Sequence, residues 1–107
     1  MKPWHVEICD VTLRDGEQTP GVSFTPEEKK DIATRLDAIG IEVIEAGFPI
    51  VSVHEKEMIR EISRLGLSAK ICGLSRACRE DVDASLDAEV DMIGLFIAPS
   101  DLHLKYK

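Results

Sequence analysis

Hydrophobic and polar positions along the chain follow two spacings, one typical of strands and the other of helices. Short apolar, β-branched runs occupy residues 5–11, 41–46, 69–74 and 91–98, and they predict four strands. In the three segments that follow residue 24, apolar side chains recur every three or four positions, which predicts three helices. Strands that alternate with helices favour a parallel sheet with right-handed crossovers, and therefore an α/β fold.

Two of the predicted helices carry start signals. Thr25 with Glu28, and Ser52 with Glu55, have the spacing of a capping box, in which a hydroxyl and a carboxylate satisfy backbone N–H groups at the start of a helix. In each of these two helices a glycine, Gly40 or Gly66, follows the last apolar position, as expected for a C-terminal stop.

The third helix is predicted over residues 80–88. Its spacing places Val82 and Leu86 toward the sheet. We expect three aspartates on the solvated side: Asp81, Asp83 and Asp87. The acidic run at 80–83 lies at the helix start, where negative charge is favourable.

Two parallel architectures fit this order, a small doubly wound sheet and part of a (β/α) barrel, and periodicity does not separate them. No G-x-G-x-x-G follows the first strand, so a dinucleotide-binding fold is not supported. A Walker A sequence is absent as well. One core fits into 107 residues, so residues 1–107 form a single unit.

Charge and composition exclude some classes of function. The chain has 13 basic and 20 acidic side chains, a net charge of −7, which argues against general binding to nucleic acids or membrane surfaces. No apolar run is long enough to span a bilayer, and the first residues contain no signal segment. Three cysteines cannot all pair, so we expect a cytoplasmic protein in which Cys9, Cys72 and Cys78 are small core residues.

Candidate chemistry gathers where the predicted strands end, since sites in parallel α/β folds form at that edge. Arg14 and Asp15 follow the first strand, and Glu45 lies near the end of the second. An arginine offers a donor fork for an oxyanion, and an aspartate suits a divalent cation. Taken alone, the Arg-Asp pair in a glycine loop equally fits a plain turn, and Glu45 equally fits a structural ion pair.

Residues 10–21, DVTLRDGEQTPG, resemble the signature of the 2-isopropylmalate, homocitrate and citramalate synthases, which belong to the DRE-TIM metallolyase superfamily of TIM barrels. The segments IEAGFP at 44–49, GLSRA at 73–77 and APSDLH at 98–103 agree in the same order. The resemblance covers the whole chain. It implies that residues 1–107 correspond to the N-terminal half of a TIM-barrel catalytic domain, because such a barrel needs about 250 residues.

The resemblance implies a Claisen-type condensation of acetyl-CoA with a 2-oxo acid, followed by release of CoA, in amino-acid and particularly leucine biosynthesis. Asp15 would bind a divalent metal (Mg, Mn or Zn), Arg14 would stabilise the developing oxyanion, and Glu45 would help to position the substrate. The remaining substrate-binding candidates are Gln18, Phe48, Leu74, Arg76 and His103.

The family completes its metal site with an H-x-H motif, which this chain lacks. We therefore expect the 107-residue chain to be inactive alone, with 2-isopropylmalate synthase as the first parent activity, homocitrate synthase next and citramalate synthase third. One alternative is a noncatalytic half-barrel that forms a homo-oligomer, binds a partner or associates with the missing half. The other is a carbon–carbon lyase of the same superfamily.

Overall fold

A computed structural model of the chain describes residues 7–14 and 24–96, which form an α/β unit built on one parallel sheet. The strands lie in sequence order, and all three neighbouring pairs are parallel. Their bounds are β1 (Cys9–Asp10), β2 (Val43–Gly47), β3 (Lys70–Arg76) and β4 (Met92–Phe96). The predicted α/β class and the predicted four parallel strands are therefore confirmed.

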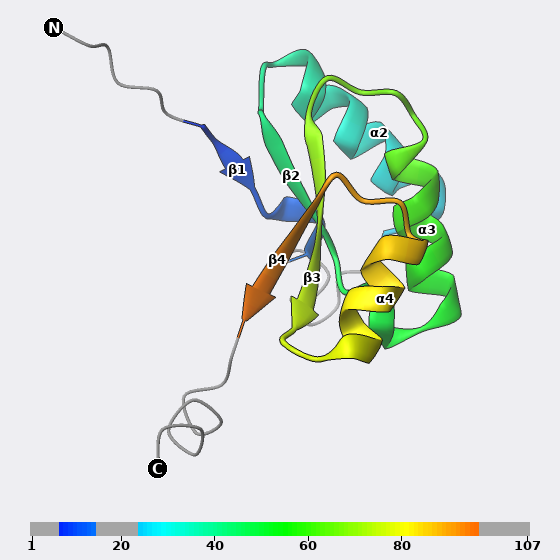
Figure 1. The fold of residues 1–107 in the computed structure, drawn as a ribbon. Helices are drawn as coiled ribbons and strands as arrows, with labels where there is room; N and C mark the ends of the chain where they lie inside the picture. Colours follow the sequence, from blue (N-terminus) through cyan, green and yellow to red (C-terminus); the bar gives the residue numbers. More distant parts are fainter. Residues whose placement is uncertain (1–6, 15–23, 97–107) are drawn as a thin grey trace, which may run out of the picture.

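Within residues 24–96, the helices between these strands are α2 (Pro26–Ala38), the short 3-10 helix η1 (Pro49–Val51), α3 (Val53–Ser63) and α4 (Arg79–Asp87). Figure 1 shows α2, α3 and α4 together on one side of the sheet, as right-handed crossovers require. Among the helices within the described ranges, none has the length and apolarity that a membrane span needs.

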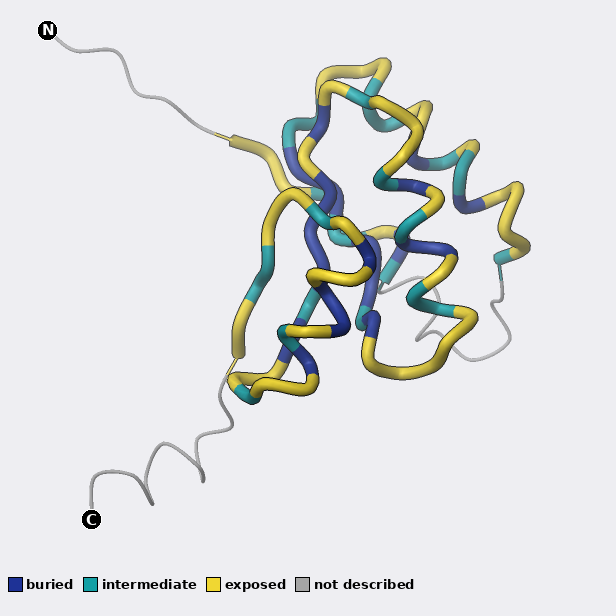
Figure 2. Tube along the Cα trace, turned by 45° about the vertical axis from the view of Figure 1, so that its right-hand side comes forward, coloured by how far each residue is buried: buried dark blue, intermediate teal, exposed yellow. Residues whose placement is uncertain are grey.

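The hydrophobic core lies between the sheet and this helical layer. Ile44 of β2 and Ile71 of β3 are almost completely buried there, against Ile59 and Ile62 of α3. Buried segments concentrate where the strands meet the helices, whereas β4 is largely exposed (Figure 2). Burial of these side chains provides the main driving force for this packing.

The opposite side of the sheet carries a different set of side chains, since successive residues of a strand point to opposite faces. Ile44 and Ile71 face the helices, so Glu45 and its register partner Cys72 face away from them. A Cβ at Gly94 would touch the side chains of Cys72 and Leu74, so Gly94 and Leu74 lie on the same side as Cys72. We call this the helix-free face, because no described helix covers it.

The capping signals are confirmed in full for α2 and in half for α3. Thr25 Oγ1 accepts from the Glu28 N–H at 3.1 Å, and Glu28 Oε1 accepts from the Thr25 N–H at 2.9 Å. Ser52 Oγ accepts from the Glu55 N–H at 3.0 Å. The side chain of Glu55 turns instead toward Lys29 of α2, at 3.3 Å.

The predicted orientation of α4 is wrong. Leu86 is 61% exposed, whereas Asp81 is 1% exposed. The helix presents Asp81, Ala84 and Ser85 to the sheet, and the Ser85 hydroxyl bonds that of Ser75 at 2.7 Å. The contact face is therefore turned by one residue toward small and hydrogen-bonded side chains, which periodicity of apolar residues does not reveal.

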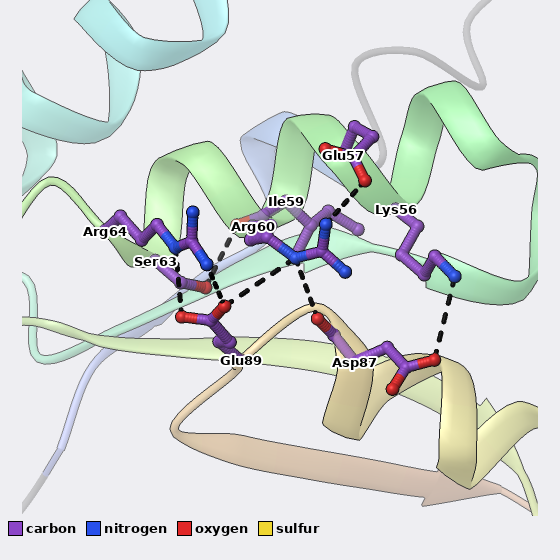
Figure 3. A network of polar contacts seen from close by, with 8 residues as sticks. All are labelled: Lys56, Glu57, Ile59, Arg60, Ser63, Arg64, Asp87 and Glu89. Carbon is purple, nitrogen blue, oxygen red and sulfur yellow. Dashed lines mark hydrogen bonds and ion pairs between the residues drawn. The ribbon is translucent and has the colours of Figure 1, made fainter.

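A polar network fastens α3 to the turn after α4 (Figure 3). Arg60 Nε donates to the Asp87 carbonyl at 2.9 Å, and Arg64 Nε bonds Glu89 Oε1 at 3.1 Å. Lys56 Nζ lies 3.7 Å from Asp87 Oδ2. Because most of these groups are solvated, each pair adds little free energy, and the network mainly orients the two helices.

Replacement of Thr25 by alanine tests the cap of α2. Thr25→Ala removes the acceptor for the Glu28 N–H and should lower the free energy of unfolding by about 1 kcal/mol. Urea denaturation followed by circular dichroism measures this change. The matched control is Thr34→Ala in the same helix, where alanine has the higher helix propensity and no loss is expected. Equal stability of Thr25→Ala and the wild type would contradict the account.

Candidate active site

An arginine–carboxylate pair joins the ends of the first two strands on the helix-free face. Arg14 follows β1, and its N–H bonds the Val11 carbonyl at 3.1 Å, so the chain turns sharply after the strand. Arg14 Nε lies 2.7 Å from Glu45 Oε1, with 23% of the Arg14 side chain and 18% of the Glu45 side chain exposed. Sequence reasoning placed both residues at this edge, and the structure brings them into contact.

Cys9 approaches the other oxygen of the same carboxylate. Its Sγ lies 3.6 Å from Glu45 Oε2. Partial burial and the adjacent Glu45 carboxylate raise the pKa of the Cys9 thiol, and the same two causes raise the pKa of Cys72. Neighbouring negative charge disfavours a thiolate, so both thiols stay protonated at neutral pH.

The prediction that all three cysteines are core residues is wrong for Cys9, which is exposed, and correct for Cys72, which is buried. Cys78 is only half-buried. The contact of Cys9 with Glu45 could not be predicted from hydrophobic periodicity, because β1 contains only two residues.

Phe48 and Leu74 lie on the helix-free face. The Phe48 ring meets the Phe96 ring edge to face, with 5.9 Å between centroids. Phe96 is in register with Arg76 and is therefore in phase with Leu74 on the helix-free face. The two residues predicted to shape a side-chain pocket thus come to the same face as Glu45.

Arg76 is engaged elsewhere. Its Nε and Nη2 bond the two carboxylate oxygens of Asp81 at 3.0 and 2.9 Å, and its backbone N–H bonds Oδ2 at 2.9 Å. These bonds hold the pKa of the Asp81 carboxyl well below its usual range. The prediction of a solvated Asp81 is wrong, since this carboxylate closes the connection between β3 and α4. The side chain of Arg76 is still 64% exposed at the carboxyl end of β3.

Three predicted site residues lie outside the described residues: Asp15, Gln18 and His103. Within residues 7–14 and 24–96, no group of three histidine, cysteine or acidic side chains is arranged to hold a metal ion. The described part of the chain therefore does not itself fit a metal, and we derive no chemical step through one.

The described geometry favours binding of an anion or a polarised carbonyl oxygen. Arg14 is fixed through Nε by Glu45, and its guanidinium lies at the carboxyl ends of parallel strands. A donor fork held in this way stabilises negative charge that develops on an oxygen, without needing to reorganise.

Comparisons with known proteins agree with this arrangement. A family model described as HMGL-like matches residues 5–107. The chain is 62% identical over 106 residues to homocitrate synthase AksA of Methanosarcina acetivorans, covering 99% of this chain and 26% of that protein. It is 60% identical over 105 residues to 2-isopropylmalate synthase of Methanocaldococcus jannaschii, covering 98% of this chain and 20% of that protein.

A third relative carries a different activity in its name. The chain is 55% identical over 102 residues to the putative (R)-citramalate synthase CimA of Methanothermobacter thermautotrophicus, covering 95% of this chain and 25% of that protein. The chain thus spans between 20% and 26% of the length of these three curated relatives.

Replacement of Glu45 by glutamine tests the contact with Cys9. Glu45→Gln removes the carboxylate charge and should lower the pKa of the Cys9 thiol, although partial burial keeps that pKa above its ordinary value. The pH dependence of Cys9 alkylation by iodoacetamide, followed by peptide mass spectrometry, measures it. Glu57→Gln on α3 is the control. An unchanged Cys9 profile in Glu45→Gln would refute the contact.

The Arg76–Asp81 pair predicts a specific response to acid. The folded-state pKa of Asp81 is depressed, so its stabilisation is complete above the unfolded-state value of about 4 and is lost as pH falls toward the folded-state pKa. Asp81→Asn should therefore destabilise the chain at pH 7 and flatten the fall in unfolding free energy below pH 4. Urea denaturation across pH measures this, with the exposed Asp83→Asn as control. If the unfolding free energy fell equally steeply below pH 4 in Asp81→Asn and in the wild type, the result would contradict this prediction.

Proposed function

Since the chain belongs to the HMGL-like family, we propose that residues 1–107 supply the N-terminal half of the catalytic barrel of an acyltransferase, which condenses acetyl-CoA with a 2-oxo acid. The observation that carries the proposal is the Arg14–Glu45 pair at the carboxyl ends of β1 and β2. The names of the relatives, all synthases, support it.

In this proposal each candidate has a distinct task. Arg14 stabilises the oxygen on which negative charge develops during the condensation, and Glu45 fixes Arg14 and positions the substrate. The methyl carbon of acetyl-CoA loses a proton and forms a carbon–carbon bond with the keto carbon of the oxo acid, whose C=O π bond opens to an alkoxide that takes up a proton. Water then hydrolyses the thioester, which releases CoA and leaves a carboxylate. Phe48 and Leu74 border the space for the oxo-acid side chain.

The other candidates extend the site in the same proposal. Arg76 contributes a guanidinium at the edge of β3, where a substrate carboxylate would bind. Gln18 and His103 are further substrate contacts. Asp15 would be one ligand of a divalent metal, as the resemblance of residues 10–21 implies. The protein works in the cytoplasm, on small molecules.

The oxo acid defines the product. We keep 2-isopropylmalate synthase as the first activity, with 3-methyl-2-oxobutanoate as substrate, followed by homocitrate synthase with 2-oxoglutarate and citramalate synthase with pyruvate. Relatives named for all three activities lie between 55% and 62% identity, so overall similarity does not favour one. A carbon–carbon lyase of the same superfamily would run a related reaction in the cleavage direction.

Exposed apolar side chains favour a second candidate function, association with another chain. On β4, Met92 and Phe96 are in phase with Gly94 on the helix-free face and are 38% and 43% exposed. A parallel sheet of this kind is normally covered on both faces. In this candidate the chain binds a second copy of itself, or the remaining part of the barrel, through the helix-free face.

Activity is best tested in a chimera. Residues 1–107 replace the matching segment of homocitrate synthase AksA of Methanosarcina acetivorans, and release of CoA from acetyl-CoA is measured with each of the three oxo acids. We expect activity with at least one of them, and a fall in kcat of at least ~100-fold in Arg14→Lys and in Glu45→Gln. Arg35→Lys on the exposed side of α2 is the control and should leave kcat unchanged.

Three results would count against the proposal. An inactive but folded chimera would argue against compatibility with a synthase barrel, and full kcat in Arg14→Lys would remove that residue from the reaction. CoA release by the 107-residue chain alone at the rate of the chimera would refute the expected inactivity. Light scattering of the chain alone separates the second candidate, which predicts a dimer or larger species at micromolar concentration.

A further inference from the structure

The register between β2 and β3 shifts immediately after Glu45. Glu45 pairs with Cys72, but Gly47 pairs with Gly73, so Ala46 is an extra residue on β2. Such a bulge reverses the alternation of side chains beyond it. Glu45 faces away from the helices, Ala46 and Gly47 both lie toward them, and Phe48 returns to the helix-free face, where it meets Phe96. The bulge thus brings Phe48 to the same face as Glu45.

Gly47 makes this bulge possible. Its φ is +137°, a conformation that side chains rarely adopt. A Cβ at Gly47 would collide with Glu55 Oε2 and contact Ile59 Cδ1 at 3.7 Å. The carboxylate of Glu55 therefore occupies, from the helical side, the space that a side chain at position 47 would fill.

Glu55 is itself held in place by two helices. Its N–H is bonded to Ser52 Oγ at the start of α3. Its Oε1 lies 3.3 Å from Lys29 Nζ of α2, and Lys29 is only 6% exposed. An ion pair in so enclosed a place is screened far less by water than one on the surface, so it holds its members in one geometry.

We propose that Glu55, anchored by Lys29, is a positioning residue for the candidate active site and acts through Gly47. By filling the space beside Gly47, it maintains the bulge that keeps Glu45 and Phe48 on one face of the sheet, with Glu45 beside Arg14 and Phe48 beside Phe96. No atom of Glu55 needs to touch the substrate. The importance of this device for the condensation rests on the proposed function, whereas its effect on the geometry of Glu45 does not.

The test uses Cys9 as a reporter, because its thiol contacts Glu45 Oε2. In the 107-residue chain, Glu55→Ala empties the space beside Gly47, lets the bulge relax and moves the Glu45 carboxylate away from Cys9. We expect the pKa of Cys9 to fall by about half a pH unit, or about threefold in thiolate fraction at neutral pH. The pH dependence of alkylation measures it, and amide hydrogen exchange at Gly47 and Phe48 should accelerate.

The matched control is Glu61→Ala. Glu61 bonds Lys30 Nζ at 2.5 Å and so also links α3 to α2, but it does not contact Gly47. A purely structural role of the helix–helix ion pairs predicts the same Cys9 profile in Glu61→Ala and Glu55→Ala. The positioning role predicts that only Glu55→Ala changes it.

A second variant covers the case in which Glu55→Ala does not fold. Glu55→Gln keeps the volume beside Gly47 and weakens only the contact with Lys29, so a smaller fall in the Cys9 pKa is expected. A folded Glu55 variant with the wild-type Cys9 profile would overturn the proposal, as would an unchanged profile in Glu45→Gln. If the Cys9 profile shifts as expected but the chimera is inactive, the positioning device stands and the proposed function fails.

Discussion

The structure depends on one constraint, the handedness of the connections between parallel strands. Each right-handed crossover returns its helix to the same side of the sheet, so α2, α3 and α4 all cover one face. Apolar side chains such as Ile44 and Ile71 fill that side. The other face is then available for side chains that a core does not tolerate, among them the carboxylate of Glu45.

A carboxylate in the middle of a strand is costly to remove from water unless it is paired. Glu45 meets this requirement through Arg14, at 2.7 Å, and through the thiol of Cys9. The same pairing fixes the direction of the Arg14 guanidinium, so stabilisation of the fold and preparation of an anion-binding group come from one contact. The bulge after Glu45 extends this arrangement to Phe48, and the helical layer supports it through Glu55 and Lys29.

Sequence patterns predicted what depends on local spacing. The four strands, the box at Thr25 and the position of Arg14 and Glu45 at one edge all follow from periodicity and from the rule for parallel sheets. Three features did not follow. Asp81 is buried because it reaches back to Arg76, Cys9 is exposed beside Glu45, and the bulge at Ala46 changes which side chains share a face. Each depends on contacts between distant segments or on a register shift, neither of which alters hydrophobic periodicity.

The central claim is that Arg14 and Glu45 form a coupled pair across β1 and β2 in this chain. A double-mutant cycle tests it most directly, with unfolding free energies measured for the wild type, Arg14→Met, Glu45→Gln and the combined variant. We predict a coupling energy of about 1 kcal/mol, because residues in direct contact do not act independently. Additive effects, within about 0.3 kcal/mol, would contradict the pairing on which the proposed site depends.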